Sequence, residues 1–169
     1  YSRTVKVVAQ SKGIDQWTER FELAEGIKTV EVNKEIFPAG IAQFTVYDET
    51  GRPVAERLFF MNTDKKLTLT ITPGKQQYQP REKVSLVLQT TDRDNKPVPA
   101  NLSLSVIDDK LWTMADDKQH NILSWLLLGS ELKGKIEEPS FYFKQDEPAA
   151  KASLDLLMLT HGYRYYDFI

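Results

Sequence analysis

Acidic side chains are the first candidates for chemistry in this chain. Asp92, Asp94 and Asn95 are spaced like the start of a calcium-binding loop, but an EF-hand also needs Gly at its sixth place and Glu at its twelfth. Pro97 and Ser103 stand at those places. The same three residues are typical of a tight turn, because Asp accepts local backbone hydrogen bonds and Asn tolerates a positive φ. We therefore predict a turn here and no metal site.

Four further carboxylates and two histidines have the right chemistry for acid–base catalysis or metal binding. The carboxylates belong to Asp108, Asp109, Asp116 and Asp117. Paired carboxylates catalyse reactions when their environments separate their pKa values, but these four flank the end of a predicted strand, where solvated acids are common. His120 and His161 are far apart, and neither has a histidine four residues away. We predict no catalytic residues and no metal ligands.

Composition removes several other classes of function. The chain has no cysteine, which excludes disulfides, thiolate metal sites and thiol nucleophiles within it. It has no Gly-rich phosphate loop and no Gly-x-Ser-x-Gly elbow. The net charge is −2, with scattered Lys and Arg, which argues against a nucleic-acid partner. No apolar run approaches the roughly 20 residues of a membrane helix. We therefore expect a protein that is not an enzyme, has no cofactor and has no direct membrane span.

The most unusual candidate for a binding surface lies near the end of the sequence. Tyr163, Arg164, Tyr165 and Tyr166 follow one another there. Aromatic residues with Arg are typical of interface anchors. The alternative is that these residues pack the last helix onto a sheet or lead into a following domain.

The elements that would position these residues are mainly strands. Residues 1–62 contain five runs in which apolar and polar residues alternate, the pattern of half-buried strands. These runs cover residues 4–9, 17–23, 27–32, 41–47 and 54–61. Residues 63–66 are polar and unpatterned, and we place a boundary there. The strand pattern resumes over residues 67–71, 84–88 and 102–106.

Helices are expected only after about residue 118. Residues 121–133 predict one helix, in which Gly129 is unfavourable. A second helix is predicted from about Ala152 to His161, with Ser153 or a neighbour as its cap and Gly162 at its stop. Leu154, Leu156, Leu157 and Leu159 point almost all round this helix, which predicts burial on every side.

A short motif occurs twice. Asp48 to Val54 and Asp92 to Val98 share Asp, then Gly or Asn, a basic residue, Pro and Val at the same offsets. Gly51 and Asn95 tolerate a positive φ, so each copy predicts a hairpin turn. Two such turns between strands indicate two β-sandwich units of one kind. We therefore predict a mainly β fold with two immunoglobulin- or fibronectin-like antiparallel sandwiches, over residues 1–62 and 67–169, the second with a C-terminal helical insertion.

Several stretches of the sequence resemble a known family of domains. Residues 8–13, 37–48 and 53–60 resemble the end of a macroglobulin-type domain, and residues 78–84 resemble the Tyr-x-Pro-Gly-Glu-x-Val opening of the next, with Arg81 where Gly is usual. Residues 102–108 resemble its later strand. Residues 121–134, 138–143 and 154–164 are similar to a narrower group, the large surface proteins of Gram-negative bacteria found near TonB-dependent outer-membrane receptors.

The resemblance implies a role as well as a fold. Macroglobulin-type domains are fibronectin-like sandwiches that serve as scaffold and interaction surface. The expected function is a non-catalytic structural or interaction module of a larger, extracytoplasmic cell-envelope protein, in the periplasm or at the outer-membrane surface. Its expected partners are neighbouring domains of a longer chain, with an outer-membrane receptor or another envelope protein as further candidates. One alternative is part of a protease-trapping alpha-2-macroglobulin-like inhibitor, whose Cys–Gln thioester this chain cannot form. Another is a carbohydrate-binding unit.

The first predicted unit is short for its type. A seven-stranded sandwich takes about 100 residues, whereas about 62 precede the boundary. We expect residues 1–62 to lack N-terminal strands, and we expect the resulting free sheet edge to favour edge-to-edge self-association.

Overall fold

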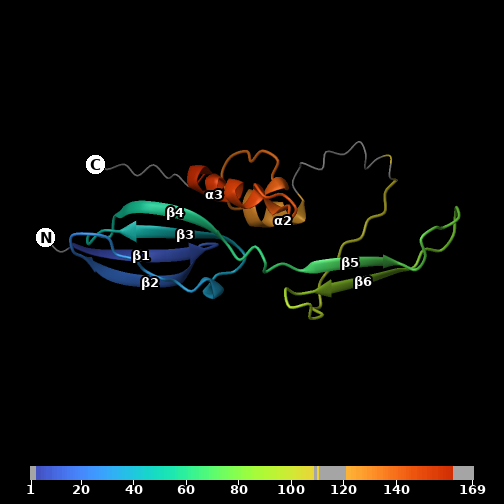
Figure 1. Cartoon of the computed structure of the whole chain (residues 1–169), viewed down its shortest axis with the longest axis horizontal. Helices are drawn as coiled ribbons and strands as arrows, with labels where there is room; N and C mark the ends of the chain where they lie inside the picture. The colour runs from blue at the N-terminus through green and yellow to red at the C-terminus, as the bar shows by residue number, and fades with distance from the viewer. Residues whose placement is uncertain (1–2, 109, 111–120, 162–169) are drawn as a thin grey trace. The chain divides into compact units, whose positions relative to one another are not determined.

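The computed structural model describes residues 3–108, 110 and 121–161 of the 169-residue chain (Figure 1). The fold is mainly β, with two antiparallel sheets and few helices. Contacts within the chain define two compact units. One comprises residues 1–63 together with 113–169, and the other comprises residues 64–112.

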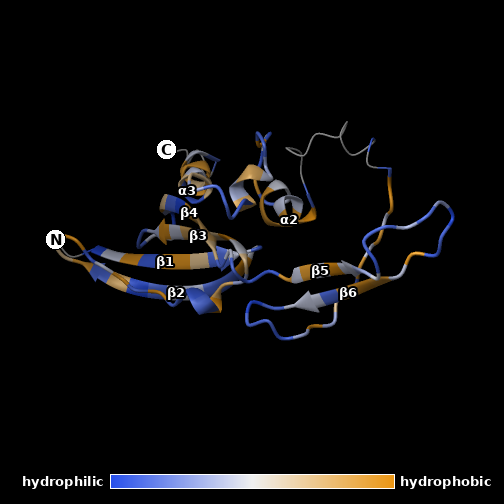
Figure 2. Ribbon diagram, turned by 45° about the vertical axis from the view of Figure 1, so that its right-hand side comes forward, coloured by the Kyte–Doolittle hydropathy of each residue, from blue (hydrophilic) through white to orange (hydrophobic). Residues whose placement is uncertain are grey.

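The first unit is built on a four-stranded antiparallel sheet in the order β2-β1-β3-β4. Its strands are β1 (Arg3–Ser11), β2 (Ile14–Leu23), β3 (Gly40–Tyr47) and β4 (Pro53–Met61). Strand β1 carries both hydrophobic and hydrophilic residues (Figure 2), with Val7, Val8 and Ala9 as a consecutive apolar run. Lys12 and Gly13 join β1 to β2 with φ values of 52° and 74°, because a two-residue hairpin that follows the twist of its strands needs positive φ at both positions.

The strand predicted over residues 27–32 does not form. Residues 24–39 instead connect β2, at one edge of the sheet, to β3 on the far side of β1. Val32 and Phe37 pack against Ala9 and Ala42 on the way, whereas Ile27 is 98% exposed. The segment crosses one face of the sheet, so its backbone cannot join the ladder. A single 3-10 turn, η1 (Lys34–Ile36), lies within it and is an exception to the expectation of helices only after residue 118.

The predicted first helix is much shorter than expected. Residues 121–133 form only α2 (Ile122–Ser124), followed by a π turn, η2 (Trp125–Gly129). Asn121 and Ser124 form a reciprocal capping box at its start, each side chain accepting from the other residue's backbone N–H. Gly129 ends the π turn, in keeping with its low helix propensity.

The second helix forms as predicted in most of its length. A 3-10 turn, η3 (Phe141–Phe143), precedes α3 (Ala150–His161). The helix begins two residues before the predicted Ala152, where the Ala150 N–H donates to the Glu147 carbonyl. Leu154 and Leu157 are buried, but Leu156 and Leu159 are 59% and 45% exposed. The prediction of burial all round the helix was therefore wrong, and α3 is buried on one side only.

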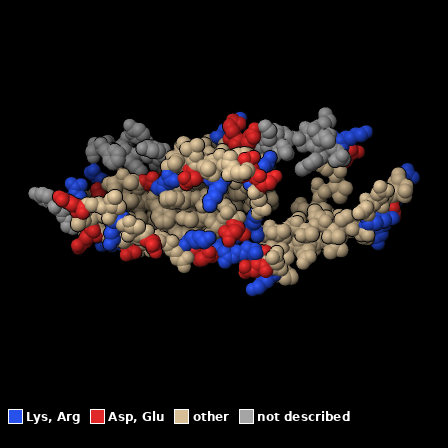
Figure 3. Space-filling view, viewed as in Figure 1, with Lys and Arg blue, Asp and Glu red and all other residues tan. Residues whose placement is uncertain are grey.

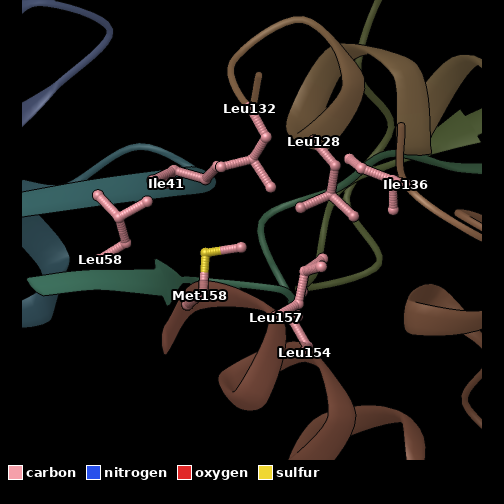
Figure 4. Packing of buried hydrophobic residues seen from close by; sticks show 8 residues of the cluster. All are labelled: Ile41, Leu58, Leu128, Leu132, Ile136, Leu154, Leu157 and Met158. Atoms are coloured by element: carbon pink, nitrogen blue, oxygen red, sulfur yellow. The ribbon is translucent and has the colours of Figure 1, made fainter. Parts of the chain in front are cut away.

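The buried side of this helical segment completes the core of the first unit. Ile41 of β3 and Leu58 of β4 pack against apolar side chains from the helical segment (Figure 4). Those side chains belong to Leu128, Leu132, Ile136, Leu154, Leu157 and Met158. Phe60 adds an edge-on contact to Phe143, with ring centroids 5.6 Å apart.

The helices therefore belong to a different unit from the one predicted. We expected them in the second unit, over residues 67–169, because they follow its strands in sequence. The structure groups them with the first sheet, whose β3 and β4 present the apolar side chains that the helices cover. A helix packs against the sheet that offers an uncovered apolar face. The order of elements in the sequence does not show which sheet that is.

The second unit is a single pair of antiparallel strands. β5 (Thr68–Pro73) pairs with β6 (Leu86–Thr91). The predicted strand over residues 102–106 is not paired. No residue of 64–108 or 110 is buried. A two-stranded sheet alone is marginally stable in water, and three or more strands with an apolar face are needed for independent stability.

Shortening one buried side chain of α3 tests which sheet the helix stabilises. We expect Leu157→Ala to destabilise the first unit by about 2–5 kcal/mol, the usual range for a buried leucine. Chemical denaturation followed by the fluorescence of Trp17 measures this when Trp112 and Trp125 are replaced by Phe, because Trp17 lies in the first sheet. The matched control is Leu156→Ala, which removes an exposed leucine from the same helix and should change stability by less than about 0.5 kcal/mol. Equal effects of the two substitutions would contradict the packing described.

Candidate interaction surfaces

The two copies of the Asp-to-Val motif form equivalent turns. Asp48 Oδ1 accepts from the N–H groups of Thr50 and Arg52, both at 2.9 Å. Asp92 Oδ1 accepts in the same way from Asp94 and Lys96, also both at 2.9 Å.

The backbone of the two copies matches as well. The N–H of the Asp donates to the carbonyl four residues later in each, at 2.9 Å and 3.0 Å. Gly51 and Asn95 have φ values of 83° and 60°. The predicted equivalence of the turns is confirmed. Hydrogen bonding by the Thr50 hydroxyl, and then by the Arg52 N–H, lowers the pKa of Asp48, so the carboxylate is occupied by its own turn.

A carboxyl group that the sequence did not single out is partly buried in the first unit. Glu131 follows the π turn, and its Oε1 atom is buried with no hydrogen-bond partner among the described residues. It lies against Gly40, where a Cβ atom would come within 3.4 Å of Oε1. Burial raises the pKa of Glu131, and the charge of Lys12 partly opposes this. The sequence signal for this contact is Gly40, where the absence of a Cβ atom leaves room for the carboxyl group.

The face of the first sheet opposite the helices is largely apolar and only partly covered, and its charged members are Glu19, opposite Val7, and Arg57, opposite Phe44. Strand register places Val5 opposite Phe21, Val7 opposite Val46, and Ala9 between Trp17 and Phe44. We define the open face as Val5, Val7, Phe21, Phe44, Val46 and Phe59. Residues 24–39 cover its Ala9 end through Val32 and Phe37. The rest keeps partial solvent access, and Phe59 is 37% exposed.

Aromatic contacts order this open face. Phe44 lies between Phe37 and Phe59, with ring centroids 5.7 Å and 5.4 Å away. Trp17 and Phe21 are 6.1 Å apart. Offset and edge-on pairs of this kind stabilise beyond their burial alone. The open face is thus lined by packed aromatic rings, with the Arg57 guanidinium 4.9 Å from the centre of the Phe59 ring.

Two shallow cavities lie at the end of the sheet where β1 begins. One, of about 430 Å³, is lined by Thr4, Val5, Lys6, Arg20, Tyr47, Asp48, Glu49 and Gly51. The other, of about 570 Å³, is lined by residues that include Arg3, Leu23, Val46 and Val54. Lys6 faces Arg20 across the β1–β2 pair and lies 6.0 Å from the centre of the Tyr47 ring. Because Asp48 and Glu49 line the same cavity, its charges are mixed and indicate no particular class of small ligand.

The remaining candidate residues form no metal-ligand cluster in the described ranges. Within residues 3–108, 110 and 121–161, no three His, Asp or Glu side chains cluster as metal ligands would. On the face shown in Figure 3, basic and acidic side chains are interspersed. No helix in the described part of the chain is long and apolar enough to cross a membrane.

Several predicted residues lie outside the described ranges. These are Tyr163, Arg164, Tyr165 and Tyr166 of the candidate interaction surface, together with Asp109, Asp116, Asp117, His120 and the predicted helix stop Gly162. Asp108 Oδ1 accepts from the Lys110 N–H at 2.8 Å. The Nδ1 atom of the His161 ring lies 3.3 Å from the Lys133 carbonyl oxygen. The side chain at the end of α3 therefore contacts the backbone of the loop between η2 and η3. Trp125 is 53% exposed, and the carbohydrate-binding alternative therefore stays open.

Comparison of the chain with protein-family models, with curated proteins and with solved structures gives no match. The macroglobulin resemblance rests on the sequence stretches alone.

Glu131 gives the first unit a defined pH dependence. A raised folded-state pKa means that this carboxyl favours folding below its unfolded pKa, and that the contribution is lost as pH rises through the folded pKa. We therefore expect Glu131→Gln to raise the denaturation midpoint at pH 7–8 and to flatten the decline in stability that occurs as pH rises above the usual titration range of a glutamate. Partial solvent access keeps the gain below about 1 kcal/mol. The control is Glu31→Gln, at an exposed position, which should leave the pH profile unchanged. A lower midpoint for Glu131→Gln at pH 7–8 would contradict the assignment.

Proposed function

We propose that this chain is a non-catalytic structural and interaction module of a larger macroglobulin-type cell-envelope protein. The observation that carries the proposal is that both sheets present apolar surface that the described parts of their own unit leave uncovered. In the first unit this is the open face, and in the second it includes Leu69, Ile71 and Leu88.

Uncovered apolar faces on sheets support a packing role. A sheet with one apolar face is stable when a second layer covers that face. Large exposed apolar patches on folded domains mark contacts with other proteins, membranes or ligands, and a covering protein layer is the contact that a sheet face fits. In this proposal each unit is half of an immunoglobulin- or fibronectin-like sandwich, and the covering layers come from neighbouring domains of the same longer protein.

The location follows from the resemblance. The narrower group that residues 121–134 and 154–164 are similar to consists of surface proteins, so the module acts outside the cytoplasm. Fractionation of the producing cell, with detection of the natural gene product in the envelope, tests the location independently of the packing role.

Hydroxyl-radical footprinting tests the packing role. In the purified chain Phe21 and Phe59 should be oxidised readily, because the open face keeps solvent access. In the natural full-length gene product we expect severalfold less oxidation at both positions. Leu156 is the internal control, since it is exposed on α3 and should react equally in the two samples. Equal oxidation of Phe21 and Phe59 in both samples would contradict the role.

The same natural protein separates the scaffold from the protease trap. Incubation with a broad-specificity protease should leave no protease held in the product when it is separated by size. Protease retained with its activity on small substrates preserved, and its activity on large substrates lost, would favour the inhibitor.

A further inference from the structure

The edge of β6 that faces away from β5 is unpaired over Leu86 and Leu88 among the described residues. The Gly74 N–H donates to the Ser85 carbonyl at 2.9 Å, so the backbone groups of Ser85 face β5. Backbone groups alternate in direction along a strand, and those of Leu86 and Leu88 therefore face the opposite edge of β6. The sheet has two strands, and among the described residues no further strand lies on that edge.

The segment that follows β6 pairs with the C-terminal end of that edge. The turn from Asp92 to Lys96 reverses the chain, and the Val98 N–H donates to the Thr90 carbonyl at 3.0 Å. Pro97 forms an antiparallel bridge with Thr91. The structure shows no regular pairing beyond this point. Continued in the same register, the hairpin would place Ala100 opposite Leu88, Leu102 opposite Leu86, and Leu104 opposite Val84.

The side chains fit this register. Register places Leu69, Ile71, Leu86 and Leu88 on one face of the β5–β6 pair. Leu102 and Leu104 would join the same face, because directly opposed residues share a face, and the intervening Ser103 would point to the other side. At present Leu102 and Leu104 are 48% and 58% exposed. A shift of one residue would reverse this match.

The positions of two prolines fit the same register, independently of the apolar side chains. Val98 directs its N–H toward β6, so positions 97 and 99 direct theirs away. Pro97 and Pro99 stand at those two positions, where the missing N–H costs no ladder hydrogen bond. Proline is tolerated on edge strands with this orientation. It also prevents a further strand from pairing at the outer side, which protects the new edge.

We propose that the free edge of β6 is a strand-binding edge and that residues 100–104 of the same chain are its ligand. Pairing converts the two-stranded sheet into three strands with an apolar face, and the structure shows the open form. The occupant is the chain's own segment, because the turn and the Val98–Thr90 pair already hold it in register. The strand would form whether or not the module packs within a larger protein.

Paired cysteines test the register directly, because the natural chain contains none. Ser85 and Ser103 would be directly opposed at a non-hydrogen-bonded pair, where Cα atoms lie about 4.5 Å apart, within disulfide range. We expect Ser85→Cys with Ser103→Cys to cross-link within one molecule under mild oxidation. The matched control, Ser85→Cys with Ser105→Cys, is two residues out of register and should react at least about tenfold more slowly.

Amide hydrogen exchange on the unaltered chain gives a second readout. The N–H groups of Leu102 and Leu104 should exchange more slowly than those of Ser103 and Ser105, which would face outward. Equal cross-linking rates for the two cysteine pairs, predominant covalent dimers, or equal exchange along residues 102–105 would each overturn the proposal. Dimers would indicate that the strand of a second copy occupies the edge instead.

Discussion

The contact between the helical segment and one face of the first sheet holds the first unit together. Ile41 and Leu58 lie in the sheet, and the rest of their buried cluster lies far along the chain, between Leu128 and Met158. Closing so long a loop costs little more than closing a short one, because the entropic cost grows only with the logarithm of length. The second unit, residues 64–112, is therefore an excursion between two parts of one core. The exposed ion pair of Arg57 with Asp155, at 2.9 Å, adds little to that contact.

This arrangement explains why the two sheets differ. The first sheet gains a buried core on one face, and its other face has the open surface ordered by Phe44 and Phe59. The second sheet has no buried residue in its described part. Its stability depends on apolar surface that the third strand and an external layer would cover. In the proposed scaffold role both units are completed by neighbouring domains.

Local sequence patterns predicted the strands and turns better than they predicted which elements pack against each other. Alternation gave all four strands of the first sheet, and the Asp-x-x-[Gly/Asn] offsets gave both turns, because these features depend on neighbours a few residues away. The strand over residues 27–32 failed because a crossover segment must leave the sheet plane. The helices were assigned to the wrong sheet because a pattern shows that Leu157 is apolar but cannot show which face it meets. Glu131 was missed for the same reason, since its burial against Gly40 depends on a contact distant in sequence.

Native-state hydrogen exchange tests most directly whether the helical segment and the first sheet form one cooperative unit. We predict that the slowest amides of β3, β4 and α3 share one free energy of opening and one dependence on denaturant. The amides of β5 and β6 should exchange faster and through a separate opening. A contradicting result would be that the amides of α3 exchange through an opening of much lower free energy than those of β3 and β4, or through the opening of β5 and β6. The helix would then not hold the first unit together.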